Sequence, residues 1–269
     1  MEFHDGIYDQ VLSETLFAAL ANGVAEQARS VADLTAEDSA TRLADALASQ
    51  LVRILDDLDG RGIEKVRRQL ELVNSILVTT REGLGRAGGD LDAFRDPLQV
   101  LQAIHRTGPA PAYPDTGLAN PWLFTAGRGS PSLLAELRRE LSACDQVDIL
   151  VSFITYSGVR KLIDVLRAAT ALGALQTSRT KIRILTTTYT GATEIRALDE
   201  LAALPGCEIR ISLDGRRTRL HAKAWIFQRA TGFGSAYVGS ANLSGAALMG
   251  GAGCGSCSRH PTASFMHRW

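Results

Sequence analysis

Hydrophobic residues recur at three- and four-residue spacing over the first hundred positions of the chain. They form two sets, Leu43, Leu47, Leu51, Ile54 and Leu58, and then Val66, Leu70, Val73 and Leu77. This spacing places each set on one face of a helix. The stretch "TAED" at 35–38 supplies Thr35 as an N-cap, with acidic residues in the first turn. The stretch "LDGRG" at 58–62 separates the two helices. With an earlier helix from Asp9 to about Ala28, residues 1–105 are predicted to form a helical region, a small bundle whose function the sequence does not reveal.

The pattern changes after this region. Residues 106–131 are rich in Pro, Gly and Ala, which is typical of a linker that Trp122, Leu123 and Phe124 could anchor to a domain surface. From residue 132, helical patterns alternate with apolar runs. Helices are predicted at 132–143, 157–172 (with Ser157 as cap) and 193–204, and strands at 147–154, 181–189, 207–213 and 219–228. This alternation predicts an α/β fold, a layered sheet with helices on its faces and an apolar strand 147–154 buried on both faces.

Composition narrows the class of protein. Lys+Arg and Asp+Glu are equal at 29 each, so any basic binding site must be local. The chain starts without a secretory signal pattern, and no stretch approaches the roughly 20 apolar residues that span a bilayer. We therefore expect a cytoplasmic protein with no membrane partner, in which Cys144 and Cys207 are buried thiols.

The stretch "RLHAKAWIF" at 219–227 places two chemically active side chains in a strand-like run. Because side chains alternate across a strand, His221, Lys223, Trp225 and Phe227 are predicted to share one face. An imidazole and an ammonium would then emerge about 7 Å apart. Alone, each residue more often has a structural role, so a functional interpretation requires further polar groups nearby in the chain.

The residues after this strand supply such groups. Residues 231–235 predict a hairpin turn, and the returning strand ends at Gly239 and Ser240. Asn242 and Ser244 come next, where a helix opens. A hydroxyl, an amide and helix-start N–H groups would lie together and suit an anion, although such a turn can also simply cap a helix. A histidine that attacks phosphorus, with these groups neutralising the phosphate oxygens, can cleave a phosphodiester without a metal or other cofactor.

This ordered set resembles the signature of the phospholipase D superfamily, H-x-K, four residues, D, a spacer and G-S-x-N. The resemblance implies a phospholipase D-like layered sheet and a phosphodiesterase. It also implies His221 as nucleophile, Lys223 and Asn242 as phosphate-gripping catalytic residues, and Ser240 with Gly239 at the phosphate. The superfamily takes two histidines from two motif copies. One copy per chain therefore implies a homodimer.

Longer stretches, including "ILVSFITYSGVRKLIDVL" and "TRLHAKAWIFQRATGFGSAYVGSANLSGAAL", resemble the amino-terminal nuclease-like module of bacterial superfamily-2 (DEAD/DEAH-type) helicases. This resemblance covers most of residues 5–248 and implies nucleic acid as substrate, with DNA favoured over RNA. The match also has departures. Gln228 stands where the signature has aspartate. The resemblance stops after Leu248, so that a final strand and the helicase portion are expected to be missing. Residues 132–248 are then a truncated phospholipase D-like domain.

Two further predictions concern the arginines around the motif strand and the carboxy-terminal tail. Arg216, Arg217, Arg219 and Arg229 flank the motif strand and could track a phosphate backbone, or they could be solvated hairpin charges. Residues 249–269 are expected to be a disordered tail. Their Cys254, Cys257, His260 and His267 could bind zinc, but the spacing fits no common finger, and no metal site is assigned.

Two further functions compete with a nuclease. One is a catalytically inactive module for nucleic-acid binding or assembly, which Gln228, the missing carboxy-terminal strand and the single motif favour. The other is lipid headgroup hydrolysis, which the absence of a basic amphipathic membrane helix in the sequence disfavours.

Overall fold

A computed structural model shows how these patterns fold. The structure describes residues 9–23, 31–85, 91–104, 110–124, 131–172, 179–213, 220–250 and 254–259. The chain divides into two compact units, Met1–Leu101 and Gln102–Trp269, close to the boundary that the sequence predicts at residue 105.

The first unit is helical, as predicted. Its helices are α1 (Glu14–Gly23), α2 (Ala36–Asp57) and α3 (Gly62–Leu84). The Thr35 side chain accepts a hydrogen bond from the Asp38 amide, so the predicted cap of α2 is confirmed. Within the described part of this unit, Leu70 is the one buried residue, whereas Leu43 and Leu47 remain more than half exposed. The helices therefore do not enclose the shared core that the expected bundle requires.

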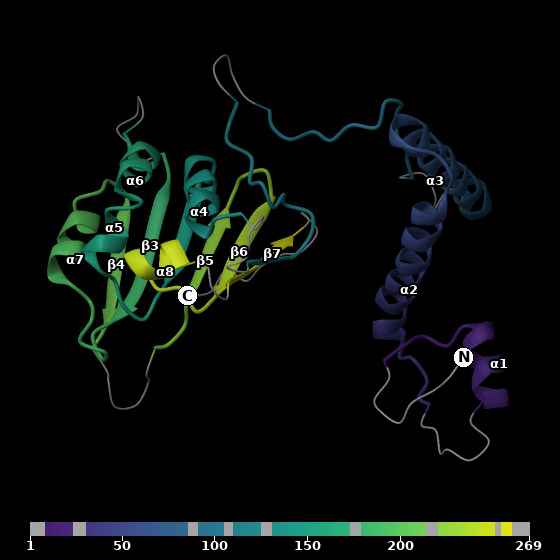
Figure 1. Cartoon of the computed structure of the whole chain (residues 1–269), viewed down its shortest axis with the longest axis horizontal. Helices are drawn as coiled ribbons and strands as arrows, with labels where there is room; N and C mark the ends of the chain where they lie inside the picture. The colour runs from purple at the N-terminus through teal and green to yellow at the C-terminus, as the bar shows by residue number, and fades with distance from the viewer. Residues whose placement is uncertain are drawn as a thin grey trace. The chain divides into compact units, whose positions relative to one another are not determined.

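The second unit is built on one mixed sheet (Figure 1). Its strands run in the order β1-β7-β6-β5-β2-β3-β4. Their bounds are Trp122–Phe124, Gln146–Leu150, Lys181–Thr187, Cys207–Ser212, Ala224–Gln228, Gly234–Gly239 and Cys254–Arg259 for β1 to β7. β2, β3 and β4 are parallel, while β5 runs antiparallel to β2 and is joined to β6 by the predicted hairpin. The predicted α/β sheet with flanking helices and a preceding helical region is confirmed.

Helices α4 to α8 flank this sheet. They are Leu133–Ser142, Tyr156–Val159, Ile163–Thr170, Ile195–Ala202 and Gly245–Gly250. The single helix predicted at 157–172 is wrong, because the chain forms two helices, α5 and α6, and the cap is Thr155 rather than Ser157. Short-range hydrogen bonds, such as Lys161 N to Gly158 O at 3.0 Å, close α5 before α6 begins.

The expected linker and tail contain two strands of the sheet. Trp122–Phe124 forms β1, and the Phe124 side chain is only 1% exposed, so the predicted anchoring role holds for this residue. Cys254–Arg259 forms β7, which pairs with both β1 and β6. The prediction of disorder is therefore wrong for these six residues. β-pairing satisfies backbone groups whatever the side chains are, so a Gly/Ser-rich segment can still add a strand.

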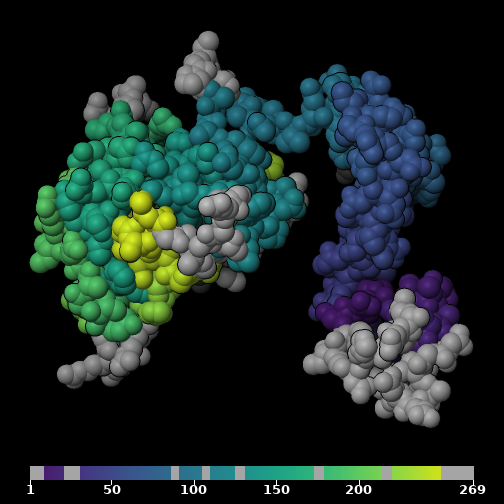
Figure 2. Space-filling model, in the orientation of Figure 1, coloured from purple at the N-terminus to yellow at the C-terminus, as the bar shows by residue number. Residues whose placement is uncertain are grey.

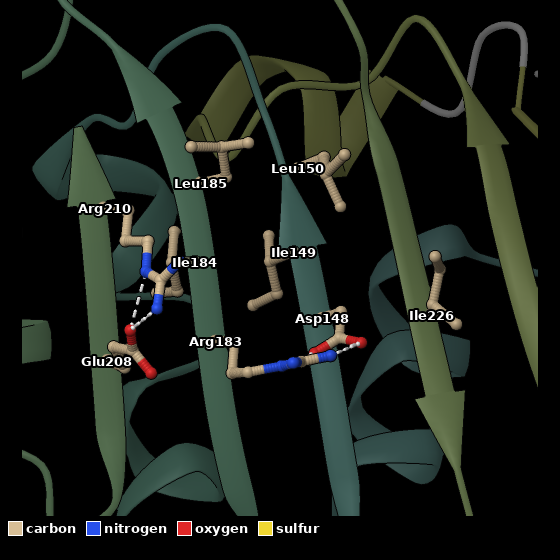
Figure 3. A pocket seen from close by; sticks show the side chains of 9 residues that line it. All are labelled: Asp148, Ile149, Leu150, Arg183, Ile184, Leu185, Glu208, Arg210 and Ile226. Atoms are coloured by element: carbon tan, nitrogen blue, oxygen red, sulfur yellow. Dashed lines mark hydrogen bonds and ion pairs between the residues drawn. The ribbon is translucent and has the colours of Figure 1, made fainter. Parts of the chain in front are cut away.

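The two faces of the sheet differ. Val147, Ile149, Ile182 and Ile184 are buried with residues of the flanking helices in one core. The other face carries Asp148, Arg183, Glu208, Arg210 and Ile226 around a shallow hollow (Figure 3). Arg183 pairs with Asp148 at 2.6 Å, and Arg210 pairs with Glu208 at 2.7 Å. Strand β2 is therefore not buried on both faces as predicted, because Gln146, Asp148 and Leu150 on this face are only partly buried.

Two further predictions concern the thiols and the membrane. Cys144 is buried and Cys207 partly buried, and burial raises the pKa of these thiols to about 12 and about 11 respectively. Among the described residues, no helix is both long and apolar enough to cross a membrane.

Candidate functional site

The motif segments meet where three neighbouring strands end. β2 ends at Leu150, β5 begins at Ala224 opposite it, and β6 ends at Gly239. The Gly239 amide donates to the Lys223 carbonyl oxygen over 3.1 Å, which joins the two halves of the motif through the backbone. The hairpin therefore brings Lys223 next to Gly239 and the residues after it.

His221 and Lys223 do not lie within the strand, as the sequence predicts, because β5 starts one residue after Lys223. Lys223 still continues the buried face of Trp225 and Phe227, whereas His221 is exposed. The partner strand explains the late start. After Leu150, backbone amides of the β2 segment donate to Asn242 and Leu243 instead of continuing the ladder with β5.

The Lys223 side chain is only 8% exposed. Its Nζ donates to the His221 carbonyl oxygen at 2.8 Å. Burial lowers the pKa of this ammonium, because removal from water disfavours the charged form. Within the described ranges, Lys223 Nζ has this one acceptor and no carboxylate partner, so an anionic ligand could supply a further oxygen atom and a countercharge.

Asn242 is also buried and connects distant parts of the chain. Its Oδ1 accepts from the Ser152 amide at 3.0 Å and from the Phe153 amide at 3.4 Å. Among the described residues, its Nδ2 has no hydrogen-bond partner. The amide oxygen thus holds the segment after β2, and the amide nitrogen is the group available to a ligand.

The segment after β2 is held by close packing as well. The Thr155 amide donates to Leu243 O at 3.0 Å, and Ile154 forms a parallel bridge with Leu243. A Cβ on Gly158 would lie only 2.6 Å from the Ser244 Cα, so this position requires glycine. α5 therefore fits tightly on the Asn242–Ser244 turn. Figure 2 shows α8, in yellow, at the surface of the unit among green and teal residues.

The helix-start N–H groups predicted to bind an anion are already occupied. The Gly245 amide donates to Ser157 Oγ at 3.3 Å, and the Ala247 amide donates to Ser244 Oγ at the same distance. The turn after β6 thus caps α8, as the alternative interpretation proposes. Ser240 is exposed beside Gly239, so these two predicted phosphate-binding residues lie at the end of β6, next to Lys223 and Asn242.

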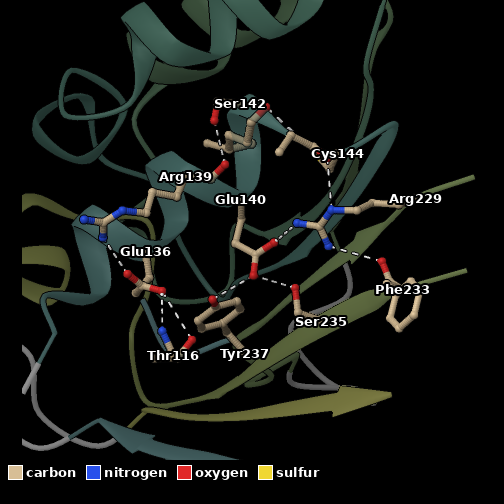
Figure 4. Close-up of polar contacts among 12 residues, drawn as sticks. Thr116, Glu136, Arg139, Glu140, Ser142, Cys144, Arg229, Phe233, Ser235 and Tyr237 are labelled. Atoms are coloured by element: carbon tan, nitrogen blue, oxygen red, sulfur yellow. Dashed lines mark hydrogen bonds and ion pairs between the residues drawn. The ribbon is translucent and has the colours of Figure 1, made fainter. Parts of the chain in front are cut away.

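A buried carboxylate fixes the hairpin that carries the motif (Figure 4). Glu140 of α4 is fully buried and pairs with Arg229, which comes directly after β5. It also accepts from Ser235 Oγ at 2.7 Å and from Tyr237 Oη at 2.9 Å. Burial and this carboxylate raise the pKa of the Tyr237 phenol. The prediction that Arg229 tracks a phosphate backbone is wrong, because its guanidinium is committed to Glu140.

The remaining predictions concern the other arginines and histidines, the residue in the aspartate position and a metal site. Arg216, Arg217 and Arg219 lie outside the described residues, as do His260 and His267. Gln228, in the place of the signature aspartate, donates to Asp148 Oδ2 at 3.0 Å on the outer face of the sheet. No cluster of His, Cys, Asp and Glu suited to a metal occurs in the part of the chain that the structure describes.

Sequence reasoning missed the contribution of residues 152–158. Ser152 and Phe153 bind Asn242, which is about ninety positions away, and no local pattern signals this contact. Two exposed arginines near this segment, Arg160 and Arg196, also carried no motif signal.

The arrangement gathers groups that can hold and attack a phosphate ester. An exposed imidazole, a buried ammonium and a buried amide come from adjacent strand ends. Such an array can bind an oxyanion through Lys223 and Asn242, and it leaves the His221 ring accessible.

No protein-family model matches this chain, and no curated protein matches it. Solved structures similar to it include NucT from Helicobacter pylori, with 17% identity, a TM-score of 0.37 and coverage of 51% of this chain and 83% of that one. Yeast tyrosyl-DNA phosphodiesterase has 12% identity, a TM-score of 0.34 and coverage of 52% and 32%. Polyphosphate kinase from Porphyromonas gingivalis has 16% identity, a TM-score of 0.34 and coverage of 51% and 22%.

The chain spans most of NucT but only a third or less of the other two. Because all the TM-scores are low, the function of this chain is inferred from its own strands and side chains.

Proposed function

We propose that the chain is a metal-independent phosphodiesterase of the phospholipase D type that acts on nucleic acid, with DNA as the preferred substrate. The observation that carries the proposal is that the Gly239 amide binds the Lys223 carbonyl. This bond brings buried Lys223 to the end of β6, just before buried Asn242, and His221 is exposed two residues before Lys223. A buried ammonium needs an anionic partner more than an exposed one does, and a phosphodiester supplies it.

The proposed reaction has two steps. A ring nitrogen of His221 attacks phosphorus and forms a P–N bond, while the P–O bond to the leaving oxygen breaks and that oxygen takes a proton from a second acid. Water then cleaves the phosphohistidine and regenerates the imidazole. Lys223 and Asn242 stabilise charge on the non-bridging oxygens in both steps.

The second acid is proposed to be His221 of another copy of the chain. His221 is the single histidine within the described ranges, so a homodimer would supply the second imidazole. Extending the resemblance, we also propose that the chain works beside a helicase portion, so that it receives strands that the helicase separates.

The test is cleavage of plasmid and single-stranded DNA, with matched RNA, by purified protein in excess EDTA. The variant His221→Ala should abolish cleavage, and the phosphohistidine should be trapped in the parent by rapid acid-free denaturation with a labelled substrate. Cleavage that persists in His221→Ala would refute the proposal. Sedimentation of the same samples should show a dimer.

The second candidate is an inactive module that binds nucleic acid. The contact of Lys223 Nζ with the His221 carbonyl favours it, since a ligand must compete for that ammonium. This candidate predicts salt-dependent binding without turnover in both the parent and His221→Ala. A strictly monomeric protein would also support it.

A further inference from the structure

Beside the candidate site, the guanidinium of an arginine lies over a tyrosine ring and points one nitrogen at the phenol oxygen. The Arg196 guanidinium carbon is 3.8 Å from the centroid of the Tyr156 ring, and Arg196 Nη2 donates to Tyr156 Oη at 2.9 Å. Arg196 is exposed, and the Tyr156 ring is partly buried against the core. The Arg196 guanidinium therefore covers the Tyr156 ring while the Arg196 side chain stays exposed to solvent.

Both residues are held in place. The Tyr156 amide donates to Glu194 Oε2 at 2.9 Å, and Glu194 in turn donates its amide to Ile154 O at 2.9 Å. Arg196 stands in the first turn of α7, two residues after Glu194. The pair is thus fixed by backbone contacts and is not a chance meeting of two long side chains.

The pair is close to the predicted phosphate-gripping residues. The Phe153 amide donates to Asn242 Oδ1, and Thr155, which precedes Tyr156, donates its amide to Leu243 O. Gly158 packs against the same turn. The segment that carries Tyr156 is therefore bound through its backbone to the turn that carries Asn242.

The arginines near Tyr156 also differ from others in the second unit in their carboxylate partners. Several arginines of the second unit pair with carboxylates, as Arg138 does with Asp164 and Arg167 with Glu200. Neither Arg160 nor Arg196, by contrast, has a carboxylate partner among the described residues. Arg160 is exposed and lies one turn after Tyr156 along the chain. Arg196 thus contacts the Tyr156 ring, Arg160 follows one turn later, and the nearby Glu194 carboxylate is bound to the Tyr156 amide.

We propose that Arg196, supported by Tyr156, is a stacking platform for an unpaired base, with Arg160 binding an adjacent phosphate, so that the chain takes single-stranded nucleic acid. This inference rests on the proposed function, since it names the form of the same substrate. Guanidinium planes and aromatic rings stack on bases of any type, and stacking requires a base that is not inside a duplex. A duplex would present only its backbone to these charges.

The test uses Arg196→Lys, which keeps the charge but removes the plane, and Arg210→Lys as a matched control on the outer face of the sheet. Both are made in the full chain with His221→Ala, so that bound strands stay intact, and are measured in EDTA. The ligands are a short oligothymidylate with a single 2-aminopurine and the corresponding duplex. Arg196→Lys should weaken single-strand binding about tenfold and change duplex binding less than about twofold. It should also abolish the change in 2-aminopurine fluorescence on binding, whereas Arg210→Lys should match the parent.

The outcomes separate this inference from the proposed function. Equal losses on single strand and duplex would show that the guanidinium binds the phosphate backbone and not a base. Unchanged single-strand binding in Arg196→Lys would show that the charge alone matters. Either result would overturn the platform. In either case, loss of cleavage in His221→Ala would still support the proposed phosphodiesterase function. If the parent binds neither form and cleaves neither, the proposed function fails and the platform fails with it.

Discussion

Removing the buried charge of Glu140 should weaken the second unit more than removing any exposed carboxylate. In Glu140→Gln, Arg229 loses the one carboxylate that it contacts, and its side chain is only 10% exposed. Its Nε and Nη1 keep the carbonyl oxygens of Ala143 and Phe233 at 3.0 and 3.2 Å, so part of its hydrogen bonding survives. Breaking one side of a buried pair costs about 3–5 kcal/mol, and we expect a loss near the lower end, about 3 kcal/mol.

The assay is equilibrium unfolding in urea followed by tryptophan fluorescence, which reports on the sheet through Trp225. The matched control is Glu200→Gln, which removes the carboxylate of the more exposed Arg167 pair and should cost less than about 1 kcal/mol. The double variant Glu140→Gln with Arg229→Gln should cost clearly less than the sum of the single variants, because it leaves no unpaired charge. A cost below about 1 kcal/mol for Glu140→Gln, or strict additivity, would refute the view that this carboxylate holds the hairpin.

Three further predictions concern the site and the core. Gly158→Ala should destabilise the unit by about 1–3 kcal/mol in the same assay, because its Cβ would collide with the Leu243 carbonyl; an unchanged midpoint would contradict this packing. Asn242→Ala should cost about 1–3 kcal/mol because the buried Ser152 amide loses its acceptor. Asn242→Asp should restore stability but not nucleic-acid binding, so restored binding would argue against an anion at this position. The raised pKa of Cys144, about 12 against an ordinary 9.0, means that the unfolded thiol ionises first. The contribution of the protonated Cys144 thiol to the free energy of unfolding is complete below pH 9. It is lost as the pH rises toward 12, by about 1.4 kcal/mol per pH unit. Urea midpoints measured from about pH 8 upward should fall less steeply in Cys144→Ala than in the parent.

The sequence by itself determined the local elements and the chemistry available to them. The period of the apolar residues predicted α2 and α3, strands β2 to β6 and the hairpin between Gln228 and Gly234, because local periodicity reports which side of an element is apolar. The Thr35 cap was also predictable, since its hydrogen bond spans only three residues. The motif residues were recognisable by type and order alone.

The tertiary structure determines where those residues lie and which of their side chains are already bound to other parts of the protein. Asn242 binds the segment after β2, and this contact ends the β2–β5 ladder before Lys223, so the motif lies just outside the strand. Arg229 forms an ion pair with Glu140 of α4, which lies 89 positions earlier in the chain. Strand β7 comes from a segment without strand-like side chains. In each case the deciding partner is far away in the sequence, and pairing between distant segments leaves no periodic signal in either of them.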